Sequence, residues 1–303
     1  MLMMLLYIIV VYAVIRHFSE VWKRYFISCL NAQTVRYFEK NMIEVEEDRI
    51  PRTIHRIWLG GPFPEKYGPA LAATQDANPS FDQRRWGDEE IDKLMNTVYG
   101  DHPIWGSRVR DAYNSINPSY GAARADLARY ALLYAHGGVY MDAKCSATDL
   151  LPVLKGSRFV CSFWSDAATG FPHIVGELQN GWFASEAGHP TLNLVISKVI
   201  QNIENYKERS NLEIFMCKNM NFLYDTNIVI MVTGPVPFTN MVKKSKPDWG
   251  VRVLRRSGVI TEDHLGTHKY GNGYRKNCQR LILPMEEGKK EDGLLLHFGN
   301  LIA

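Results

Sequence analysis

The chain has 303 residues, of which 46% are hydrophobic and 22% charged, a balance typical of globular proteins that bury a sizeable core. Its 35 basic and 32 acidic residues give a net charge of +3, too small an excess to indicate nucleic-acid binding. The five cysteines are widely spaced and include no Cys-x-x-Cys pair, so we expect mostly buried free thiols and neither a zinc site nor a disulfide framework.

An unbroken apolar run from Met1 to Ile15 opens the chain and is followed by Arg16 and His17. At helical rise this run extends about 22 Å, short of the roughly 30 Å hydrocarbon core of a bilayer, so a full span would need snorkelling flanks or local thinning. A cleaved signal peptide is the alternative, but it lacks a basic leading region and a prompt small-residue cleavage site. We therefore predict an uncleaved single-pass membrane anchor over residues 1–17.

The segment after the anchor mixes aromatic and charged positions, and we interpret residues 18–49 as a helical stem. The basic residues Arg16, Lys23 and Arg24 follow the apolar run. By the positive-inside tendency they would place the rest of the chain on the cytoplasmic side of the membrane.

From residue 50 onwards the patterns of strands and helices alternate. Residues 50–64 contain a strand bounded by prolines and glycines. A helical stretch over 65–77, a turn at 78–80, a short strand over 83–86 and a helix opened by Asp88 follow. Such alternation predicts an α/β fold with a mostly parallel sheet and ligands at the carboxyl ends of its strands.

Residues 123–144 form the most informative segment of the sequence. They predict a helix, with Ser119 as its N-cap, that stops at Gly137 and Gly138 and leads at once into a short apolar strand ending on Asp142. Within the helix, Asp126 and Arg129 are three residues apart and therefore share a face. A helix, a tight turn and a strand that ends in an acid together indicate a site.

Four further elements are predicted beyond this segment. A strand covers 158–163, and Asn180 precedes a small-residue strand. His189 and Pro190 introduce a helix over 191–206, and Thr233-Gly-Pro opens another helix.

These motifs resemble those of glycosyltransferase family thirty-two, whose sugar-binding region contains a DXD motif and which includes Golgi mannosyltransferases and inositol phosphorylceramide mannosyltransferases. The chain has the family's Asp-x-x-Arg and Gly-Gly-x-Tyr, followed by the first acid of Asp-x-Asp. The Ile-Pro-x-x-Ile-His-x-Ile-Trp opening at residues 50–58 and the motifs near Asn180 and Thr233 occur in the family's order. The resemblance covers roughly residues 50–240 and implies a GT-A type nucleotide-sugar-binding domain over 50–303.

The resemblance also implies an activity. Such an enzyme is a membrane-anchored hexosyltransferase that moves a sugar from a GDP- or UDP-sugar to a glycan or glycolipid acceptor with retention of configuration. Its location would be the Golgi or another secretory membrane. Golgi members usually face the lumen, which conflicts with the charge pattern after the anchor, so the orientation stays open.

Several residues acquire roles through this resemblance. Asp142 would be the catalytic residue, a donor-binding residue and the ligand of a divalent cation, Mn²⁺ by expectation, that neutralises the departing diphosphate. Asp126 and Arg129 would bind the hydroxyls and phosphate edge of the donor, Tyr140 would lie beside the nucleotide, and Asn180 would contact a sugar hydroxyl. For Asp126 and Arg129 the alternative is an ordinary exposed ion pair on a helix.

Four aromatic or imidazole side chains have structural alternatives. Trp58 either stacks on the nucleotide or packs in the core. His55 is expected to be a buried histidine with a backbone partner, and His189 is expected to start a helix. His297, near the end of the chain, is a candidate metal ligand by analogy with the fold, although a histidine flanked by leucines is more often packed.

Lys144 departs from the family, because it stands where the second acid of the motif is expected. A charged lysine cannot bind a metal and would repel a cation held by Asp142. Either Lys144 itself pairs with the diphosphate, or Asp142 holds the cation with another partner such as His297 or Asp149. A third possibility is a non-catalytic membrane protein that binds nucleotide sugars or glycans. A glycoside hydrolase is disfavoured because it needs two carboxylates across the sugar site, and only Asp142 belongs to a recognisable motif.

Overall fold

The computed structural model describes residues 29, 31–40, 42, 47–163, 177–206, 228–255, 260–262 and 281–283. Within these ranges, no helix combines the length and the apolar character needed to cross a bilayer. The predicted anchor over residues 1–17 lies outside the described residues.

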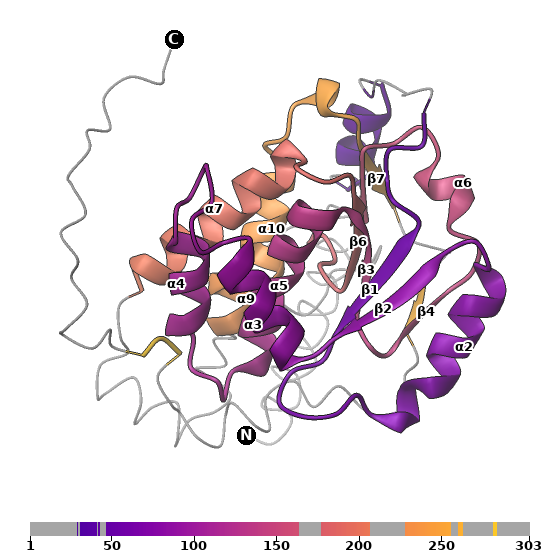
Figure 1. The fold of residues 1–303 in the computed structure, drawn as a ribbon. Coiled ribbons are helices and arrows are strands. Elements are labelled where there is room, and N and C mark those ends of the chain that lie inside the picture. The colour runs from indigo at the N-terminus through magenta and orange to yellow at the C-terminus, as the bar shows by residue number, and fades with distance from the viewer. Residues whose placement is uncertain are drawn as a thin grey trace, which may run out of the picture.

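The centre of the protein is a six-stranded mixed sheet (Figure 1). Its strands lie in the order β2 (Asp82–Trp86), β1 (Thr53–Ile57), β3 (Gly138–Met141), β6 (Trp182–Ser185), β5 (Phe159–Ser162) and β7 (Val251–Leu254). Every adjacent pair is parallel except the two that include β6, which runs antiparallel to β3 and β5. The prediction of a mostly parallel α/β sheet is therefore confirmed.

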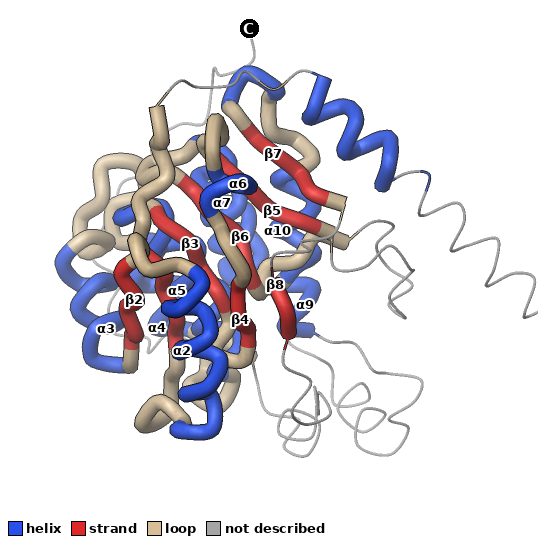
Figure 2. The backbone as a smooth tube through the Cα atoms, turned by 90° about the vertical axis from the view of Figure 1, so that its right-hand side faces the viewer, coloured by secondary structure: helices blue, strands red, loops and turns tan. Residues whose placement is uncertain are grey.

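Helices and a small second sheet cover the two faces of this sheet. On one face lie α3 (Asp88–Thr97), α4 (Arg108–Ser115), α5 (Gly121–His136), α7 (Pro190–Glu204), α9 (Ile228–Val232) and α10 (Pro235–Val242) (Figure 1). On the other lie α2 (Gly68–Ala77), α6 (Leu151–Leu154) and the antiparallel pair of β4 (Cys145–Ala147) and β8 (Ile260–Glu262) (Figure 2). Short 3₁₀ turns occur at Glu65–Tyr67 and Pro247–Trp249.

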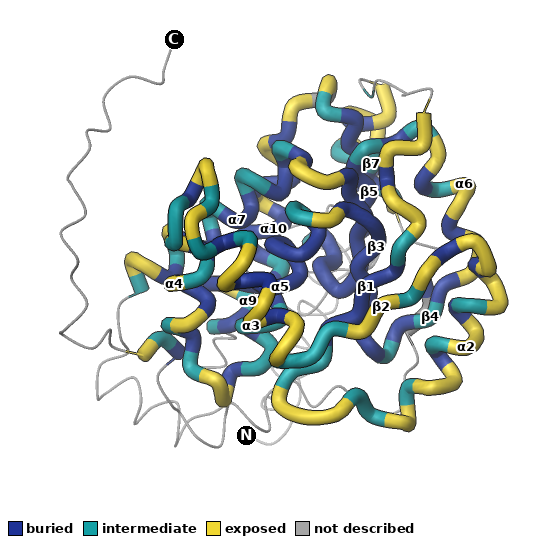
Figure 3. The backbone as a smooth tube through the Cα atoms, in the orientation of Figure 1, coloured by how far each residue is buried: buried dark blue, intermediate teal, exposed yellow. Residues whose placement is uncertain are grey.

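The central strands are buried on both faces because their alternate residues enter two different apolar clusters. In β1 and β3, Ile54 and Val139 pack on the side of β4 and α6, whereas Ile57 and Tyr140 pack with α5 and α7. Figure 3 shows the consequence, with β1, β3 and β5 buried and much of β2 exposed at the edge. The nearly continuous apolar character of β3 and β5 is typical of strands covered on both sides, whereas β1 also buries His55 and Arg56.

The Gly-Gly turn predicted between the central helix and its strand is present. Helix α5 ends at Gly137, which has a φ of 66°, and Gly138 follows with a φ of 97°. A Cβ at Gly138 would lie 2.6 Å from the carbonyl oxygen of Thr53 on β1. Both residues must therefore be glycine for β3 to pair with β1 directly after the helix.

Two expectations about helix starts have different outcomes. The predicted N-cap Ser119 is wrong, because α5 begins at Gly121 with Tyr120 as its N-cap, and the hydroxyl of Ser119 instead donates to Asn117. His189 does start α7 as expected, since its Nδ1 accepts a hydrogen bond from the N–H of Thr191 at 3.1 Å.

Part of the predicted stem contacts the rest of the protein. Residues 31–40 are helical, and their Val35 and Phe38 side chains belong to the same apolar cluster as α5 and α7. The boundaries proposed for the anchor, the stem and the domain stay a prediction.

Candidate active site

The sheet topology brings Asp142 and Asn180 together. Because β1, β2 and β3 are parallel, their carboxyl ends meet at one edge of the sheet, and Asp142 follows β3 there. Strand β6 runs in the opposite direction, with Trp182 paired to Met141, so its amino end lies beside Asp142. The N–H of Asp142 donates to the carbonyl of Gly181 at 2.8 Å.

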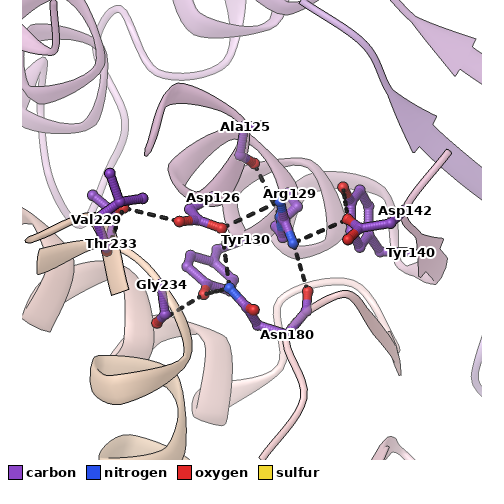
Figure 4. Close-up of polar contacts among 10 residues, drawn as sticks. All are labelled: Ala125, Asp126, Arg129, Tyr130, Tyr140, Asp142, Asn180, Val229, Thr233 and Gly234. Carbon is purple, nitrogen blue, oxygen red and sulfur yellow. Dashed lines mark hydrogen bonds and ion pairs between the residues drawn. The ribbon is translucent and has the colours of Figure 1, made fainter. Parts of the chain in front are cut away.

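Arg129 is the centre of a buried polar network at this edge (Figure 4). Its Nη2 lies 3.2 Å from Oδ1 of Asp126, and its Nη1 lies 3.3 Å from Oδ1 of Asp142. The same Nη1 donates to the carbonyl of Asn180 at 2.8 Å. The Asp126 and Arg129 side chains are each only 8% exposed, so the alternative of an ordinary surface ion pair is wrong.

Both carboxylate oxygens of Asp126 also accept hydrogen bonds. Its Oδ1 accepts from Nδ2 of Asn180 at 3.0 Å, and its Oδ2 accepts from the hydroxyl of Thr233 at 3.0 Å. Nδ2 of Asn180 also donates to the hydroxyl of Tyr130 at 2.8 Å. A buried carboxylate with this many donors is held in a single position.

Tyr140 connects the network to Asp142. Its hydroxyl donates to Oδ1 of Asp142 at 2.9 Å, and its ring lies 4.6 Å from the guanidinium carbon of Arg129. The side chain of Asp142 itself is 22% exposed, which makes it the carboxylate of the network most accessible to a ligand. The predicted contact of Tyr140 with a nucleotide stays a prediction, since its side chain is buried.

Burial and charge act on this network in opposite directions. Burial raises the pKa of Asp126 to about 6, against the lowering effects of Arg129 and of the hydrogen bonds from Thr233 and Asn180. For Arg129, burial acts to lower the pKa, but Tyr140, Asp142 and Asp126 outweigh it and the net pKa is raised. Arg129 is therefore a permanent cation held between two acids.

The raised pKa of Asp126 predicts how stability depends on pH. An unfolded aspartate loses its proton near pH 4, whereas Asp126 in the folded protein keeps its proton up to about pH 6. Between these values the folded state binds more protons, so the contribution of Asp126 to the free energy of unfolding falls as the pH rises. We expect the difference between wild type and Asp126→Asn to fall by about 1–3 kcal/mol from pH 4 to pH 6.5, measured by urea unfolding.

This difference is more informative than the wild-type curve alone. Burial lowers the pKa of both His55 and His189 to about 4, so these histidines make the protein more stable as the pH rises through the same range. Their effect cancels in the comparison with Asp126→Asn. A difference that increases with pH would contradict the raised pKa of Asp126.

His55 has the structural role expected from the sequence. Its Nε2 donates to the carbonyl of Gly137 at 3.1 Å, and its Nδ1 accepts from Nε1 of Trp86 at 3.1 Å. It therefore supports the Gly-Gly turn that leads into β3.

The other predicted site residues lie near the same edge or outside the described residues. Trp58, one residue past β1, is partly exposed and packs against Phe63 and Tyr67, with ring centroids 6.3 and 5.7 Å away. Lys144 is partly exposed two residues after Asp142. His297 lies outside the described residues.

Sequence reasoning missed three residues that hold the site together. Tyr130 and Thr233 bind Asn180 and Asp126, and Arg56 binds the backbone of Asp142. The Thr-Gly-Pro motif that contains Thr233 predicts a helix start and gives no indication of the contact with Asp126. Arg56 lies between His55 and Trp58 in the first strand motif.

The described residues do not fit a complete cation site. Over the described ranges, no three His, Cys, Asp or Glu side chains gather closely enough to hold a metal ion. Oδ1 of Asp142 is already engaged by Tyr140 and Arg129, and a cation on Oδ2 would be repelled by the guanidinium. Oδ1 of Asp149 accepts a hydrogen bond from the N–H of Leu151 at the start of α6.

Comparisons with known proteins agree with the motifs. The family model described as "Glycosyltransferase sugar-binding region containing DXD motif" matches residues 64–153. Inositol phosphoceramide mannosyltransferase 1 of Schizosaccharomyces pombe is 29% identical over 168 residues, which are 54% of this chain and 46% of that protein. Inositol phosphoceramide mannosyltransferase 3 of the same organism is 34% identical over 93 residues, 31% of this chain and 24% of that protein.

The chain thus spans less than half the length of these two curated relatives. Among solved structures, PaToxG glycosyltransferase matches with a TM-score of 0.48 and 16% identity, over 76% of this chain and 81% of that chain. The family model and the mannosyltransferase relatives confirm the resemblance predicted from the sequence: residues 64–153 are similar to a glycosyltransferase sugar-binding region, with Lys144 at the position of the second acid of its motif.

Proposed function

We propose that this chain is a glycosyltransferase with a GT-A type domain that transfers a sugar from a nucleoside-diphosphate sugar to a glycan or glycolipid acceptor. The observation that carries the proposal is the convergence of Asp126, Arg129 and Asp142, from two sequence motifs, in one network at the carboxyl edge of the sheet. Ligands of open α/β sheets bind at this edge.

Asp142 is the residue we assign to the donor sugar. Tyr140 and Arg129 hold its Oδ1, which fixes the orientation of the carboxylate. Its Oδ2 can then accept a hydrogen bond from a sugar hydroxyl. Gly181 allows this arrangement, because a Cβ there would lie 3.0 Å from Oδ2. Asp126 and Arg129 position Asp142 in addition to the donor contacts predicted for them.

Retention of configuration also belongs to the proposal. The departing diphosphate can itself assist the incoming acceptor hydroxyl, so no protein nucleophile is required. The diphosphate needs a positive partner as the glycosidic bond breaks. We assign this role to Lys144, two residues beyond Asp142. Its ammonium would replace part of the positive charge that a divalent cation otherwise supplies.

A location at a secretory membrane, with residues 1–17 as the anchor, completes the proposal. It is supported by the apolar run of the sequence and by no described part of the fold. A GDP-sugar is favoured as the first donor to test, because the similar proteins are mannosyltransferases by name.

The deciding experiment measures donor hydrolysis and transfer by the full chain over a panel of GDP- and UDP-sugars, with manganese and with a chelator. Turnover of at least one donor by wild type, lost in Asp142→Asn, would support the transferase. The alternative function, a non-catalytic nucleotide-sugar binder, is favoured by the lysine at the position of the second acid. Saturable donor binding without turnover under every condition would select that alternative.

Lys144 gives a separate prediction about metal use. If its ammonium neutralises the diphosphate, Lys144→Ala should lower turnover about tenfold or more and should make the remaining activity depend more steeply on manganese. The measurement is turnover of wild type and variant across a manganese titration with a chelated blank. Lys93→Ala, an exposed lysine on α3, is the control, and identical metal curves for Lys144→Ala and wild type would contradict charge replacement.

A further inference from the structure

Arg56 is a buried arginine whose hydrogen bonds go to neutral oxygens. Its side chain lies within the protein, and the residue is only 1% exposed. Its Nη1 donates to the carbonyls of Asp142 at 3.0 Å and Cys145 at 2.7 Å, and its Nη2 donates to the hydroxyl of Thr74 at 3.1 Å. Among the described residues, its Nε has no hydrogen-bond partner.

This arrangement is unfavourable as simple core packing. Burying a guanidinium has a desolvation penalty of several kcal/mol that only well-placed partners offset, and burial lowers the pKa of Arg56 below its ordinary value. The neighbouring inward position of the same strand, Ile54, is apolar. An aliphatic residue at position 56 would fill the space without a buried charge. Filling the core therefore does not explain why an arginine occupies this position.

The contacts converge on the turn between β3 and β4. The N–H of Cys145 donates to the carbonyl of Asp142 at 2.9 Å and closes a four-residue turn that contains Lys144. Nη1 of Arg56 binds the first and the last carbonyl of that turn. The turn is thereby tied to β1, on the side of the sheet opposite to Arg129 and α5.

Helix α2 extends the same support through Thr74. Its hydroxyl donates to the carbonyl of Ala70 at 2.7 Å, accepts from Arg56, and also accepts from the N–H of Ala147 on β4 at 3.2 Å. Thr74 therefore orients the guanidinium and holds the strand that follows the turn. Both residues are buried, which shields these bonds from competition with water.

We propose that Arg56 is a positioning residue of the donor site: it fixes the turn of residues 142–145 so that Asp142 and Lys144 face the donor. This inference rests on the proposed transferase function for its effect on turnover, but its effect on the turn can be measured without any activity. Arg129 and Tyr140 hold the Asp142 carboxylate from the helix side of the sheet, and Arg56 holds its backbone carbonyl from the other side.

Hydrogen exchange of the full chain tests the effect on the turn. In Arg56→Met, we expect the amides of a peptide over residues 142–147 to exchange at least tenfold faster than in wild type, while peptides from β5 and β7 stay within twofold. Thr74→Val should accelerate the same peptide less. Arg252→Met is the matched control. Arg252 lies on β7, away from Asp142, and also donates to two backbone carbonyls, those of Pro152 and Val153.

Kinetic constants give a second measurement, which would not change if Arg56 only stabilised the fold. Arg56→Lys keeps a cation that can reach one carbonyl but not the carbonyls and Thr74 together, and it provides the test if Arg56→Met does not fold. We expect Arg56→Lys to reduce kcat at least tenfold and to weaken the Kd of the nucleoside diphosphate alone by a smaller factor, because Lys144 moves with the turn. Equal acceleration of exchange across the whole sheet, or no acceleration at residues 142–147, would overturn the positioning role.

The two proposals fail in different ways. If wild type binds and turns over no donor, the transferase function is wrong, and faster exchange confined to residues 142–147 would still establish that Arg56 holds the turn. If wild type is active and Arg56→Lys keeps both its kcat and its exchange pattern, the transferase stands and the role of Arg56 is wrong.

Discussion

Asp142→Asn is expected to reduce sugar transfer at least about a hundredfold while the protein remains folded. The carboxylate follows β3 at the sheet edge and is partly exposed, so its replacement removes no core packing. Asparagine can still accept the hydrogen bond from Tyr140, but it loses the charge that pairs with Arg129. Loss of one preorganised polar group in an active site typically reduces turnover by about 10²–10³. Transfer assays and thermal unfolding of the purified variant are the measurements.

Asp76→Asn is the control for this prediction. Asp76 is an exposed aspartate on α2 with no role assigned in the site. We expect this variant to keep wild-type turnover and stability. Asp142→Asn with more than half of the wild-type turnover would show that Asp142 is not the residue that acts on the donor.

Several strands and helices were predictable because they have a strong local pattern, whereas α4, β4, α6, β7 and β8 were not predicted. The strand near residue 55, the helix ending at Gly137 and the helix after His189 all follow from apolar periodicity and from glycine or proline at their ends. The start of α5 was not predictable in this way. Ser119 has the residue type of an N-cap, but its hydroxyl binds Asn117 in the preceding turn.

The site was predictable where its residues lie in one short segment of the sequence. It was not predictable where it depends on how distant segments pack together. Asp126, Arg129 and Asp142 lie within one short segment, so the sequence placed them together. Thr233 reaches Asp126 because α9, which ends directly before it, contacts the central helix α5, and the short-range pattern does not contain that contact. The burial of Arg129 was likewise missed, since an Asp and an Arg three residues apart look the same on an exposed helix.

Arg56 illustrates the same limit. A positively charged residue between His55 and Ile57 suggests an exposed strand position, since arginine is rarely buried without a partner. Its partners are the carbonyls of Asp142 and Cys145, more than eighty residues away along the chain. Backbone carbonyls have no sequence signature, so only the fold reveals this contact.

The burial of Arg129 leads to the second large prediction, which concerns stability. Arg129→Met removes the cation from a pair of side chains that are each 8% exposed and leaves the Asp126 carboxyl buried without a cation, so that it must either keep an unpaired charge or take up a proton. Breaking a buried ion pair in this way typically lowers the free energy of unfolding by about 3–5 kcal/mol. Arg108→Met is the matched control, because Arg108 pairs with Glu204 at 2.7 Å but the two side chains are 51% and 45% exposed. We expect that control to lose less than about 1 kcal/mol.

A double variant separates the effect on stability from the effect on donor binding. In Asp126→Asn/Arg129→Met no buried charge remains at this position. The amide at position 126 can accept from Asn180 and donate to Thr233, whose hydroxyl can then donate to the carbonyl of Val229, 3.2 Å away. We therefore expect the double variant to recover most of the stability lost in Arg129→Met, measured by urea unfolding at pH 7.

Donor binding should not recover with stability, because Oδ1 of Asp142 would keep Tyr140 but lose the guanidinium that fixes it from the other side. Titration of the refolded double variant with the donor of wild type should show affinity at least tenfold weaker. Equal losses of stability in Arg129→Met and Arg108→Met would contradict the burial of the pair. Wild-type donor affinity in the double variant would mean that Arg129 supports the fold alone and that Asp142 is positioned by Tyr140 and the backbone of Gly181.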